Sequence, residues 1–399
     1  MNDKYQLYPV VSKVSNTGYD GSGVHCGVNH FYLYQQIDDG TEKIEFANNI
    51  QPNKKIYEIL HKHFKISEIQ KVLLEREMEE YKKHLEKKKA ILLQNVEFQV
   101  QKEKNKTQMP LCPLTNRKNV VLERQISCEN IIIAYKLNLH INVEKYFKGL
   151  KNIMVYRCLD SDFRFYYPLD VEGDSEFYES LQVIPWYYMD WKWEYEIART
   201  LIKSTDCVLE IGCGKGSFAE RLISEGVSYI GLELNKNVYR KAKEKALPIL
   251  NETIEEHAKS NFEKYDVVCM FQVLEHVASV RNFISDSLLS LKRGGKLIIS
   301  VPNHDSFVGL DKMGILDMPP HHMGLWNEKS LRNLCKIFDI QLNKLYFEPL
   351  QSYHVDYYLG IMRRVIGNEY GLHNILEELI RICPQIIKGH TVLAEYTKN

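Results

Sequence analysis

Short apolar runs alternate with amphipathic segments along the C-terminal half of the chain, from about residue 186 to residue 350. Regular alternation of strands and helices predicts crossover units and therefore a parallel sheet. The four strongest runs have the length of strands and are Val208–Ile211, Tyr229–Leu234, Val267–Phe271 and Lys296–Val301. Residues 352–388 then follow a mainly helical pattern, and Gly389–Lys398 has the pattern of a last strand.

We therefore predict a Rossmann-like α/β domain over residues 186–399. It is a three-layer sandwich with a mostly parallel sheet, whose last strand runs antiparallel at the edge. Residues 352–388 form a helical insertion before that strand, in the position of a lid.

The N-terminal part predicts a different organisation, an α+β region with one long helix. Residues 1–60 are β-rich, with two strands around the turn signal Asp39-Gly40. Residues 61–105 form a long charged helix whose apolar stripe runs through 67–105. A narrow stripe is typical of a coiled-coil seam, which would make a homo-oligomer, and equally of a helix packed on its own chain. Both alternatives stay open. Residues 106–185 form a further module of strand-like pieces.

Composition narrows the class of protein. Lys plus Arg equals Asp plus Glu at 52 each, so the chain has no overall positive field to attract nucleic acid. No apolar run reaches the length of a membrane span, and the first residues lack the pattern of a signal peptide. The nine cysteines form no paired framework. Reduced thiols and a cytoplasmic location are expected.

A glycine-rich turn is the first candidate for chemistry. The first strand ends at Ile211, and Gly212, Gly214 and Gly216 then lead into a helix that begins near Ser217. Glycines allow a sharp turn and the close approach of a ligand to the backbone. Such a turn alone does not distinguish dinucleotide-binding proteins from other nucleoside-binding ones.

Two acidic residues make that distinction. Glu210 lies two residues before the first glycine, where it would repel a pyrophosphate but attract an ammonium group. Glu233 lies at the tip of the second strand, where a carboxylate accepts hydrogen bonds from both ribose hydroxyls. S-adenosylmethionine (SAM) carries both an ammonium group and a ribose, so these acids favour SAM.

Four stretches resemble, in order and spacing, the motifs of the class I SAM-dependent methyltransferases. They are Val208–Gly216, Ile230–Leu234, Tyr265–Val277 and Leu291–Asn303. The resemblance implies the fold predicted above, SAM as cofactor and methyl transfer as the reaction. It implies cofactor contacts for Glu210, Gly212, Cys213, Gly214, Glu233, Leu234, Thr253, Ile254, Phe271 and Gln272. The aromatic segment Trp186–Tyr195 adds Tyr187 or Tyr188 as a further cofactor contact.

Three histidines are candidate catalytic bases. An alcohol acceptor needs a base, because the pKa of its hydroxyl lies far above 7. His276 follows the fourth strand, and His321 and His322 lie in a loop after the fifth. Each also has a plain structural interpretation, and the sequence leaves open which of them, if any, is the base.

Two short motifs resemble a zinc-ribbon module of methyltransferases from bacterial surface-polysaccharide clusters. They are Cys112-Pro-Leu-Thr115 and Cys158-Leu-Asp-Ser161. In that module each motif reads Cys-x-x-Cys, whereas Thr115 and Ser161 occupy the second ligand positions here. Because two thiolates do not close a tetrahedral zinc site, we expect the ribbon without its metal. We also interpret His25, Cys26 and His30 as structural, so no metal ligands are predicted.

These features predict a methyltransferase that methylates a sugar hydroxyl in glycan or nucleotide-sugar biosynthesis. The expected partner is a small-molecule or glycan acceptor. A quinone-type or other small-molecule O-methyltransferase is an alternative, because Leu274-Glu-His-Val277 suits it equally. A SAM-binding scaffold assembled through the long helix is an alternative of another class. A nucleic-acid methyltransferase is disfavoured by the zero net charge and by Phe271-Gln-Val-Leu274 in place of an Asn-Pro-Pro-Tyr-like motif.

Overall fold

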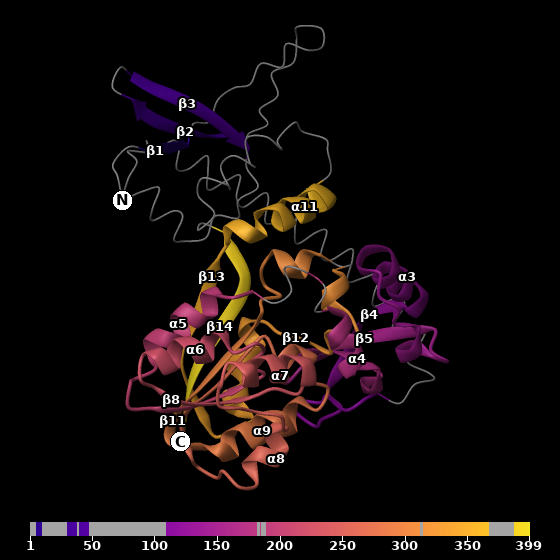
Figure 1. The fold of residues 1–399 in the computed structure, drawn as a ribbon. Helices are drawn as coiled ribbons and strands as arrows, with labels where there is room; N and C mark the ends of the chain where they lie inside the picture. Colours follow the sequence, from indigo (N-terminus) through magenta and orange to yellow (C-terminus); the bar gives the residue numbers. More distant parts are fainter. Residues whose placement is uncertain are drawn as a thin grey trace, which may run out of the picture. The chain divides into compact units, whose positions relative to one another are not determined.

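The computed structural model describes residues 5–9, 30–37, 40–47, 109–181, 184, 189–311, 314–366 and 387–399. The chain folds into two compact units (Figure 1). The unit that holds the candidate site comprises residues 106–348 and 388–399. Three predictions lie outside the described residues: the helix over 67–105, the cofactor contact of Tyr187 or Tyr188, and most of the insertion at 352–388. In the other unit, α11 (Val355–Ile366) is helical, as its sequence predicts.

The central sheet has seven strands in the order β13-β14-β11-β10-β7-β8-β9. Neighbouring strands from β9 to β11 run parallel, and β14 runs antiparallel to β11. The strands are β7 (Cys207–Ile211), β8 (Ser228–Leu232), β9 (Ile249–Leu250), β10 (Tyr265–Phe271), β11 (Leu291–Pro302), β13 (Ile340–Pro349) and β14 (Lys388–Lys398). This order confirms the predicted Rossmann-like methyltransferase sheet with its last strand antiparallel.

One detail of that prediction is wrong, because β14 does not form the edge of the sheet. The edge strand is β13, which lies beside β14. Exposed polar residues such as Gln341 and Lys344 interrupt β13, so it lacks the continuous apolar run that marks a buried strand. Edge strands are commonly polar in this way, because one side of the ladder faces solvent.

Helices cover both faces of the sheet, which confirms the three layers. One face packs against α5 (Trp193–Leu201), α6 (Ser217–Ser224) and α7 (Lys236–Glu244). The other packs against α8 (Ile254–Ala258), α9 (Val280–Ser290) and α10 (Glu328–Asn333). Side chains of β10 alternate between these two cores, as the two-residue period of a strand requires. None of the helices in the described parts of the chain is both long and apolar enough to cross a membrane.

A second, antiparallel sheet joins the 106–185 region to the main domain. Its order is β12-β6-β5-β4, and its strands are β4 (Val120–Ser127), β5 (Asn152–Cys158), β6 (Arg164–Tyr167) and β12 (Gly324–Leu325). The helices α3 (Cys128–Leu139) and α4 (Ser175–Leu181) accompany it. Because β12 comes from the methyltransferase-like region, this sheet connects the two regions directly. In the other unit, β1 (Tyr5–Pro9), β2 (His30–Ile37) and β3 (Gly40–Ala47) form a small antiparallel sheet, which confirms the predicted hairpin.

Hydrogen bonds from α3 and from the second sheet fix the segment that precedes His321. The Tyr135 hydroxyl donates to the Met318 carbonyl oxygen at 2.9 Å, and the Tyr166 hydroxyl donates to that of Asp317 at 2.7 Å. Both tyrosines are fully buried. The module therefore positions part of the candidate site as well as packing against the core.

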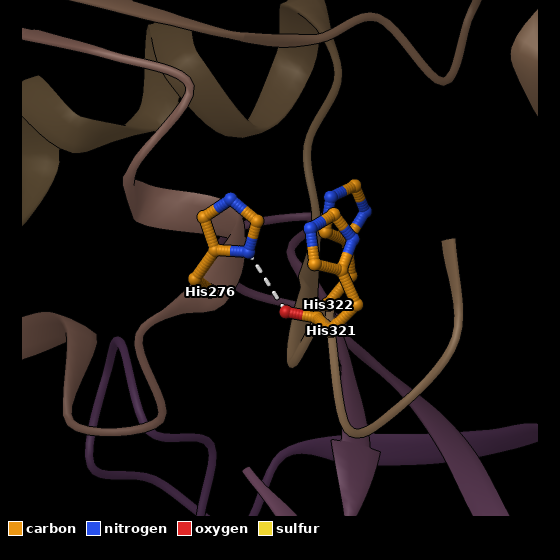
Figure 2. Close-up of side chains that lie close together, drawn as sticks. All are labelled: His276, His321 and His322. Atoms are coloured by element: carbon orange, nitrogen blue, oxygen red, sulfur yellow. Dashed lines mark hydrogen bonds between the residues drawn. The ribbon is translucent and has the colours of Figure 1, made fainter. Parts of the chain in front are cut away.

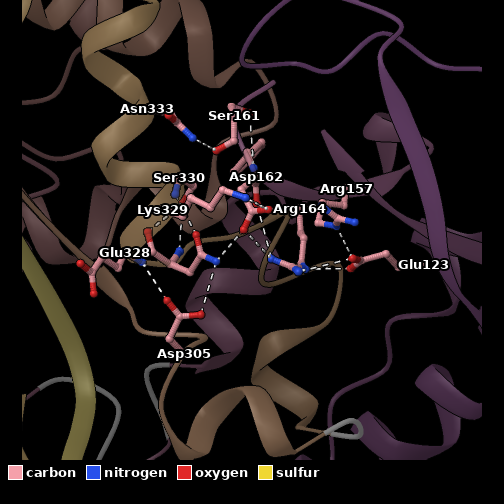
Figure 3. Close-up of polar contacts among 12 residues, drawn as sticks. Glu123, Arg157, Ser161, Asp162, Arg164, Asp305, Glu328, Lys329, Ser330 and Asn333 are labelled. Atoms are coloured by element: carbon pink, nitrogen blue, oxygen red, sulfur yellow. Dashed lines mark hydrogen bonds and ion pairs between the residues drawn. The ribbon is translucent and has the colours of Figure 1, made fainter. Parts of the chain in front are cut away.

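Asp162 is the centre of a polar network between the two regions (Figure 3). Its carboxylate accepts a hydrogen bond from Asn327 Nδ2 at 2.9 Å and lies within 3.5 Å of side-chain nitrogens of Arg157, Arg164 and Lys329. Burial raises the pKa of Asp162, but the Asn327 amide and the nearby cations outweigh this, and the net pKa is lowered. The network holds β5 and β6 against the start of α10.

We expect Asp162→Asn to lower the free energy of unfolding by about 1 to 2 kcal/mol, because it removes the counter-charge that the half-buried Arg157 and Arg164 share, although Glu123 still pairs with both. Asparagine tolerates the positive φ of 63° at this position, so the change isolates the charge. Because its pKa is lowered, the Asp162 carboxylate contributes stability at neutral pH, and this contribution is lost as pH falls below about 4. The difference in unfolding free energy between wild type and Asp162→Asn should therefore shrink at low pH. Urea unfolding measures it. The exposed Asp170→Asn is the control, and an equal loss in both variants would contradict the account.

Candidate functional site

The glycine turn is held against the ends of two strands. The backbone amides of Gly212 and Cys213 both donate to the Leu232 carbonyl oxygen, at 2.9 and 3.0 Å. Gly212 has a φ of +73°, and a Cβ there would lie 2.6 Å from a methyl group of Val273. Glycine is therefore required, and the turn contacts the segment directly after β10. As predicted, α6 begins at Ser217.

Glu233 closes this turn from the tip of β8. One carboxylate oxygen accepts the Gly214 amide at 2.9 Å, and the other accepts the Asn235 amide at 2.7 Å. A carboxylate oxygen has more than one lone pair, so each can still accept a ribose hydroxyl. Asn251 was not predicted, and its side-chain amide donates to the Glu233 carbonyl oxygen at 2.7 Å.

Glu210 lies beneath the turn with 1% of its surface exposed. The Tyr229 hydroxyl donates to its Oε2, whereas Oε1 has no hydrogen-bond partner among the described residues. Burial raises the pKa of Glu210 to about 7, although Tyr229 and Lys192 act in the opposite direction. A buried carboxyl group with an unpartnered oxygen fits an ammonium ligand. Tyr229 was not among the predicted site residues.

The remaining predicted cofactor residues divide into two groups. Leu234 is 57% exposed next to Glu233, where it offers an apolar surface to a ring. By contrast, Cys213 and Ile254 are buried in the core. Thr253 caps α8, and its hydroxyl accepts the Glu256 amide. The side chains in this second group pack or cap the fold, which leaves their backbone to face a ligand.

Phe271 and Gln272 end β10 beside the turn. Phe271 is buried and packs edge-on against Tyr195 and Phe218, with ring centroids 5.1 Å apart in both pairs. Gln272 has a φ of 57°, which is unusual for a residue with a side chain. Its Nε2 is buried with no hydrogen-bond partner among the described residues.

The fold brings His276, His321 and His322 together (Figure 2). His276 ends a short 3₁₀ helix, η3 (Leu274–His276), whereas His321 and His322 follow two prolines in a distant part of the sequence. One ring nitrogen of each residue lies within 4.8 Å of the other two. The Met323 amide donates to the Glu275 carbonyl oxygen at 2.7 Å and so joins the two segments.

The neighbours of two of the three rings define which nitrogen carries the proton. His276 Nδ1 lies 2.8 Å from the His321 carbonyl oxygen, and His321 Nδ1 lies 2.7 Å from that of Leu316. His322 Nδ1 lies 3.2 Å from a carboxylate oxygen of Asp317. Carbonyl oxygens only accept hydrogen bonds, so Nδ1 is the protonated nitrogen in His276 and His321 and Nε2 carries the lone pair, whereas His322 Nδ1 makes no hydrogen bond among the described residues.

Charge in this cluster is governed by burial. Burial lowers the pKa of His276 to about 3 and also lowers the pKa of His321 and of His322. All three imidazoles are therefore neutral at pH 7. Burial also raises the pKa of Asp317, but its contacts with His304 and His322 outweigh this, so its net pKa is lowered and it is ionised. The sequence offered no signal for Asp317 or His304.

The turn and the histidine cluster meet at the C-terminal end of β10. Val273 contacts Gly212, and the His276 amide donates to the Val273 carbonyl oxygen at 3.0 Å. Ligands of open α/β sheets bind outside the carboxyl ends of the parallel strands. Fold and site together define an α/β domain that can hold a nucleoside cofactor beside a cluster of neutral imidazoles.

Comparison with protein families agrees with this class. Residues 186–344 match the model of a family described as methyltransferase domain. Among curated proteins, the chain is similar to the ubiquinone biosynthesis O-methyltransferases of Salmonella enteritidis and Vibrio vulnificus, at 34% and 33% identity over 104 and 118 residues. These matches cover 25% and 27% of this chain. The chain spans only 43% and 50% of the length of those relatives.

Two solved structures are similar to the chain. A SAM-dependent methyltransferase from Archaeoglobus fulgidus has 22% identity and a TM-score of 0.37, over 51% of this chain and 92% of that one. A SAM-dependent methyltransferase from Thermotoga maritima, titled a possible histamine N-methyltransferase, has 18% identity and a TM-score of 0.38, over 56% of this chain and 95% of that one. The order of the strands assigns the fold.

The family match implies SAM as the cofactor of the domain. The residues present fit it. The unpartnered Oε1 of Glu210 suits the ammonium group, and the Glu233 carboxylate suits the ribose. A pyrophosphate would fit neither carboxylate, because it carries a charge of the same sign.

Proposed function

We propose that the chain is a SAM-dependent methyltransferase that methylates a hydroxyl group. One observation carries the proposal: two acids surround the glycine turn, with Glu233 bound to the Gly214 amide and Glu210 buried with an unpartnered oxygen. This pair complements the ammonium and ribose of SAM, whereas a dinucleotide phosphate would be repelled.

The residues have distinct tasks in this reaction. When bound, SAM supplies an electrophilic methyl group on a sulfonium. Glu210 and Glu233 hold the two ends of the cofactor, and Phe271 and Gln272 flank the reactive centre from the end of β10. The histidine cluster receives the acceptor, because neutral imidazoles can accept a hydrogen bond or a proton from its hydroxyl. Catalysis then rests mainly on alignment of the acceptor oxygen with the methyl carbon.

We propose a sugar hydroxyl as the acceptor. Support comes from the resemblance of Cys112–Thr115 and Cys158–Ser161 to the module of polysaccharide-cluster methyltransferases. Both cysteines are fully buried, and the Thr115 hydroxyl lies 3.5 Å from Cys158 Sγ. The two motifs are therefore neighbours, as the two halves of a ribbon site would be, with a hydroxyl at one second ligand position.

A quinone-type O-methyltransferase is the second candidate. The curated relatives that match the chain are named ubiquinone biosynthesis O-methyltransferases. The similarity covers less than two thirds of their length, so their acceptor is only a candidate here.

An acceptor panel separates the two candidates. The chain is incubated with SAM labelled on its methyl group and with nucleotide sugars, a glycan extract or a catechol. We expect label in a sugar product and none in the catechol. Transfer to the catechol alone would replace the sugar proposal with the quinone-type one. Absence of SAM binding as well as transfer would reject the enzyme class. Glu233→Ala serves as the control that does not bind SAM, because it lacks the ribose contact, and it should transfer no label.

A further inference from the structure

We infer that His276, His321 and His322 form a binding site for one divalent transition-metal ion, with Zn²⁺ as the best chemical match. The geometry of the cluster carries this inference. One ring nitrogen from each residue lies within 4.8 Å of the other two, and all three rings come from one buried corner of the domain. The inference of metal binding does not depend on the proposed function, and only the use of the ion in catalysis rests on it.

Nitrogen protonation suits metal ligation in His276 and His321, and a carboxylate lies close to the third ring. Nδ1 of His276 and of His321 faces a backbone carbonyl oxygen, and Nδ1 of His322 faces the Asp317 carboxylate. Metal-binding histidines commonly donate their second ring N–H to a carbonyl or carboxylate in this way, because the contact fixes the ring and keeps the lone pair on the other nitrogen. Asp317 is thus a positioning residue.

The rings need a short approach and a rotation of one ring to enclose an ion. Centroids of His276 and His321 lie 4.5 Å apart, as do those of His321 and His322. A zinc ion about 2.1 Å from each nitrogen would draw the three nitrogens together by about 1.5 Å. The rings of His321 and His322 are stacked with their planes 17° apart, so one of them must rotate to aim its lone pair at the ion. Three neutral imidazoles without a thiolate suit Zn²⁺, Co²⁺ or Ni²⁺ better than Mg²⁺ or Ca²⁺.

Glu275 is an independent sign that a cation belongs here. It is 1% exposed, and its Oε1 lies 3.9 Å from His276 Nε2. Its Oε2 is buried and has no hydrogen-bond partner among the described residues. A cation bound beside His276 would lie close to this unpartnered carboxyl group. Three histidines leave a fourth position open, as in catalytic rather than structural zinc sites.

In the proposed reaction that open position takes the acceptor oxygen, and this contact replaces the direct hydrogen bond from the hydroxyl to an imidazole. The ion lowers the pKa of the bound hydroxyl, whose O–H bond breaks and whose proton passes to solvent water. The oxygen then forms a bond to the methyl carbon while the carbon–sulfur bond breaks, and sulfur keeps the electron pair as a neutral thioether. Charge and atoms balance without a further reactant.

Cobalt substitution tests the site without SAM or acceptor. Tag-free protein is stripped with a chelator, dialysed and titrated with Co²⁺. We expect one ion per chain with a visible absorption band and no thiolate charge-transfer band. Failure of the wild-type chain to bind Co²⁺ at about 100 µM, well above the affinities typical of such sites, overturns the inference. A thiolate band also overturns it, because the ion would then occupy the Cys112–Cys158 region.

Variants locate the ion. We expect His276→Gln and His321→Gln to lose the bound ion, and Asp317→Asn to keep the stoichiometry with about 10- to 100-fold weaker affinity. The controls His140→Asn, an exposed residue with a φ of 56°, and Cys158→Ser should bind as the wild type does. Thermal melting in chelator checks that each variant folds. If the histidine variants do not fold, the Co²⁺ affinity of Asp317→Asn tests whether the ion binds at the histidines. Unchanged affinity there overturns the inference. Glu233→Ala should keep the ion, so loss of SAM binding and loss of metal binding are separable.

Discussion

Replacing Glu233 with alanine is expected to weaken SAM binding by about 100- to 10,000-fold. The carboxylate would accept both ribose hydroxyls, and each hydrogen bond to a charged group contributes about 1.5 to 3 kcal/mol. The substitution also removes the partner of the Gly214 and Asn235 amides, so it loosens the turn itself. Isothermal titration calorimetry with SAM measures the change.

Two further variants make this result specific. Glu233→Gln keeps the size and one acceptor oxygen, so its loss should be smaller, about tenfold. Glu255→Ala is the matched control, because Glu255 is 71% exposed on α8 and pairs only weakly with Lys259. SAM affinity unchanged in Glu233→Ala would contradict the assignment of the ribose site.

SAM affinity is expected to fall by about 80-fold from about pH 7.5 to about pH 5, because only the ionised Glu210 attracts the ammonium group. Burial raises the pKa of Glu210 from its usual value to about 7. The group is thus mostly ionised at the upper pH and almost wholly protonated at the lower. Binding should therefore release a proton, most of all near pH 6, which calorimetry in buffers of different ionisation enthalpy detects.

The groups around Glu210 determine which of them binds the proton. Tyr229 and Lys192 face its carboxyl group and favour the ionised form, whereas Glu233 opposes it. The thiols of Cys213 and Cys269 lie nearby, and burial raises the pKa of each well above the usual value, so neither ionises in this range. Glu210→Gln should bind SAM more weakly at pH 7.5 and lose most of the pH dependence. An equally steep pH dependence in that variant would assign the proton to another group.

Local patterns were sufficient to predict the central strands of the sheet and the turn. Continuous apolar runs identified β7, β8, β10 and β11, because strands buried on both faces carry little else. The edge strand β13 was missed, because its exposed residues are polar. The Tyr229 hydroxyl on Glu210 was open to prediction, since Tyr229 lies two residues before Gly231, which pairs with Glu210, and so shares its face.

The histidine cluster was only partly predictable. His276, His321 and His322 were each identified as candidates by type and loop position, but their proximity depends on the pairing of Met323 with Glu275 and on the second sheet. Asp317 lies in a loop without periodicity, so no pattern distinguishes it from a surface acid. Contacts between distant segments depend on tertiary packing, which spacing along the chain does not encode.

Titration of the wild-type chain with SAM, beside a parallel titration with NAD⁺, tests the central claim most directly. The two acids around the glycine turn predict one SAM molecule per chain with micromolar affinity and no measurable binding of NAD⁺. Absence of heat at millimolar SAM, or binding of NAD⁺ at least as tight as that of SAM, would contradict the account.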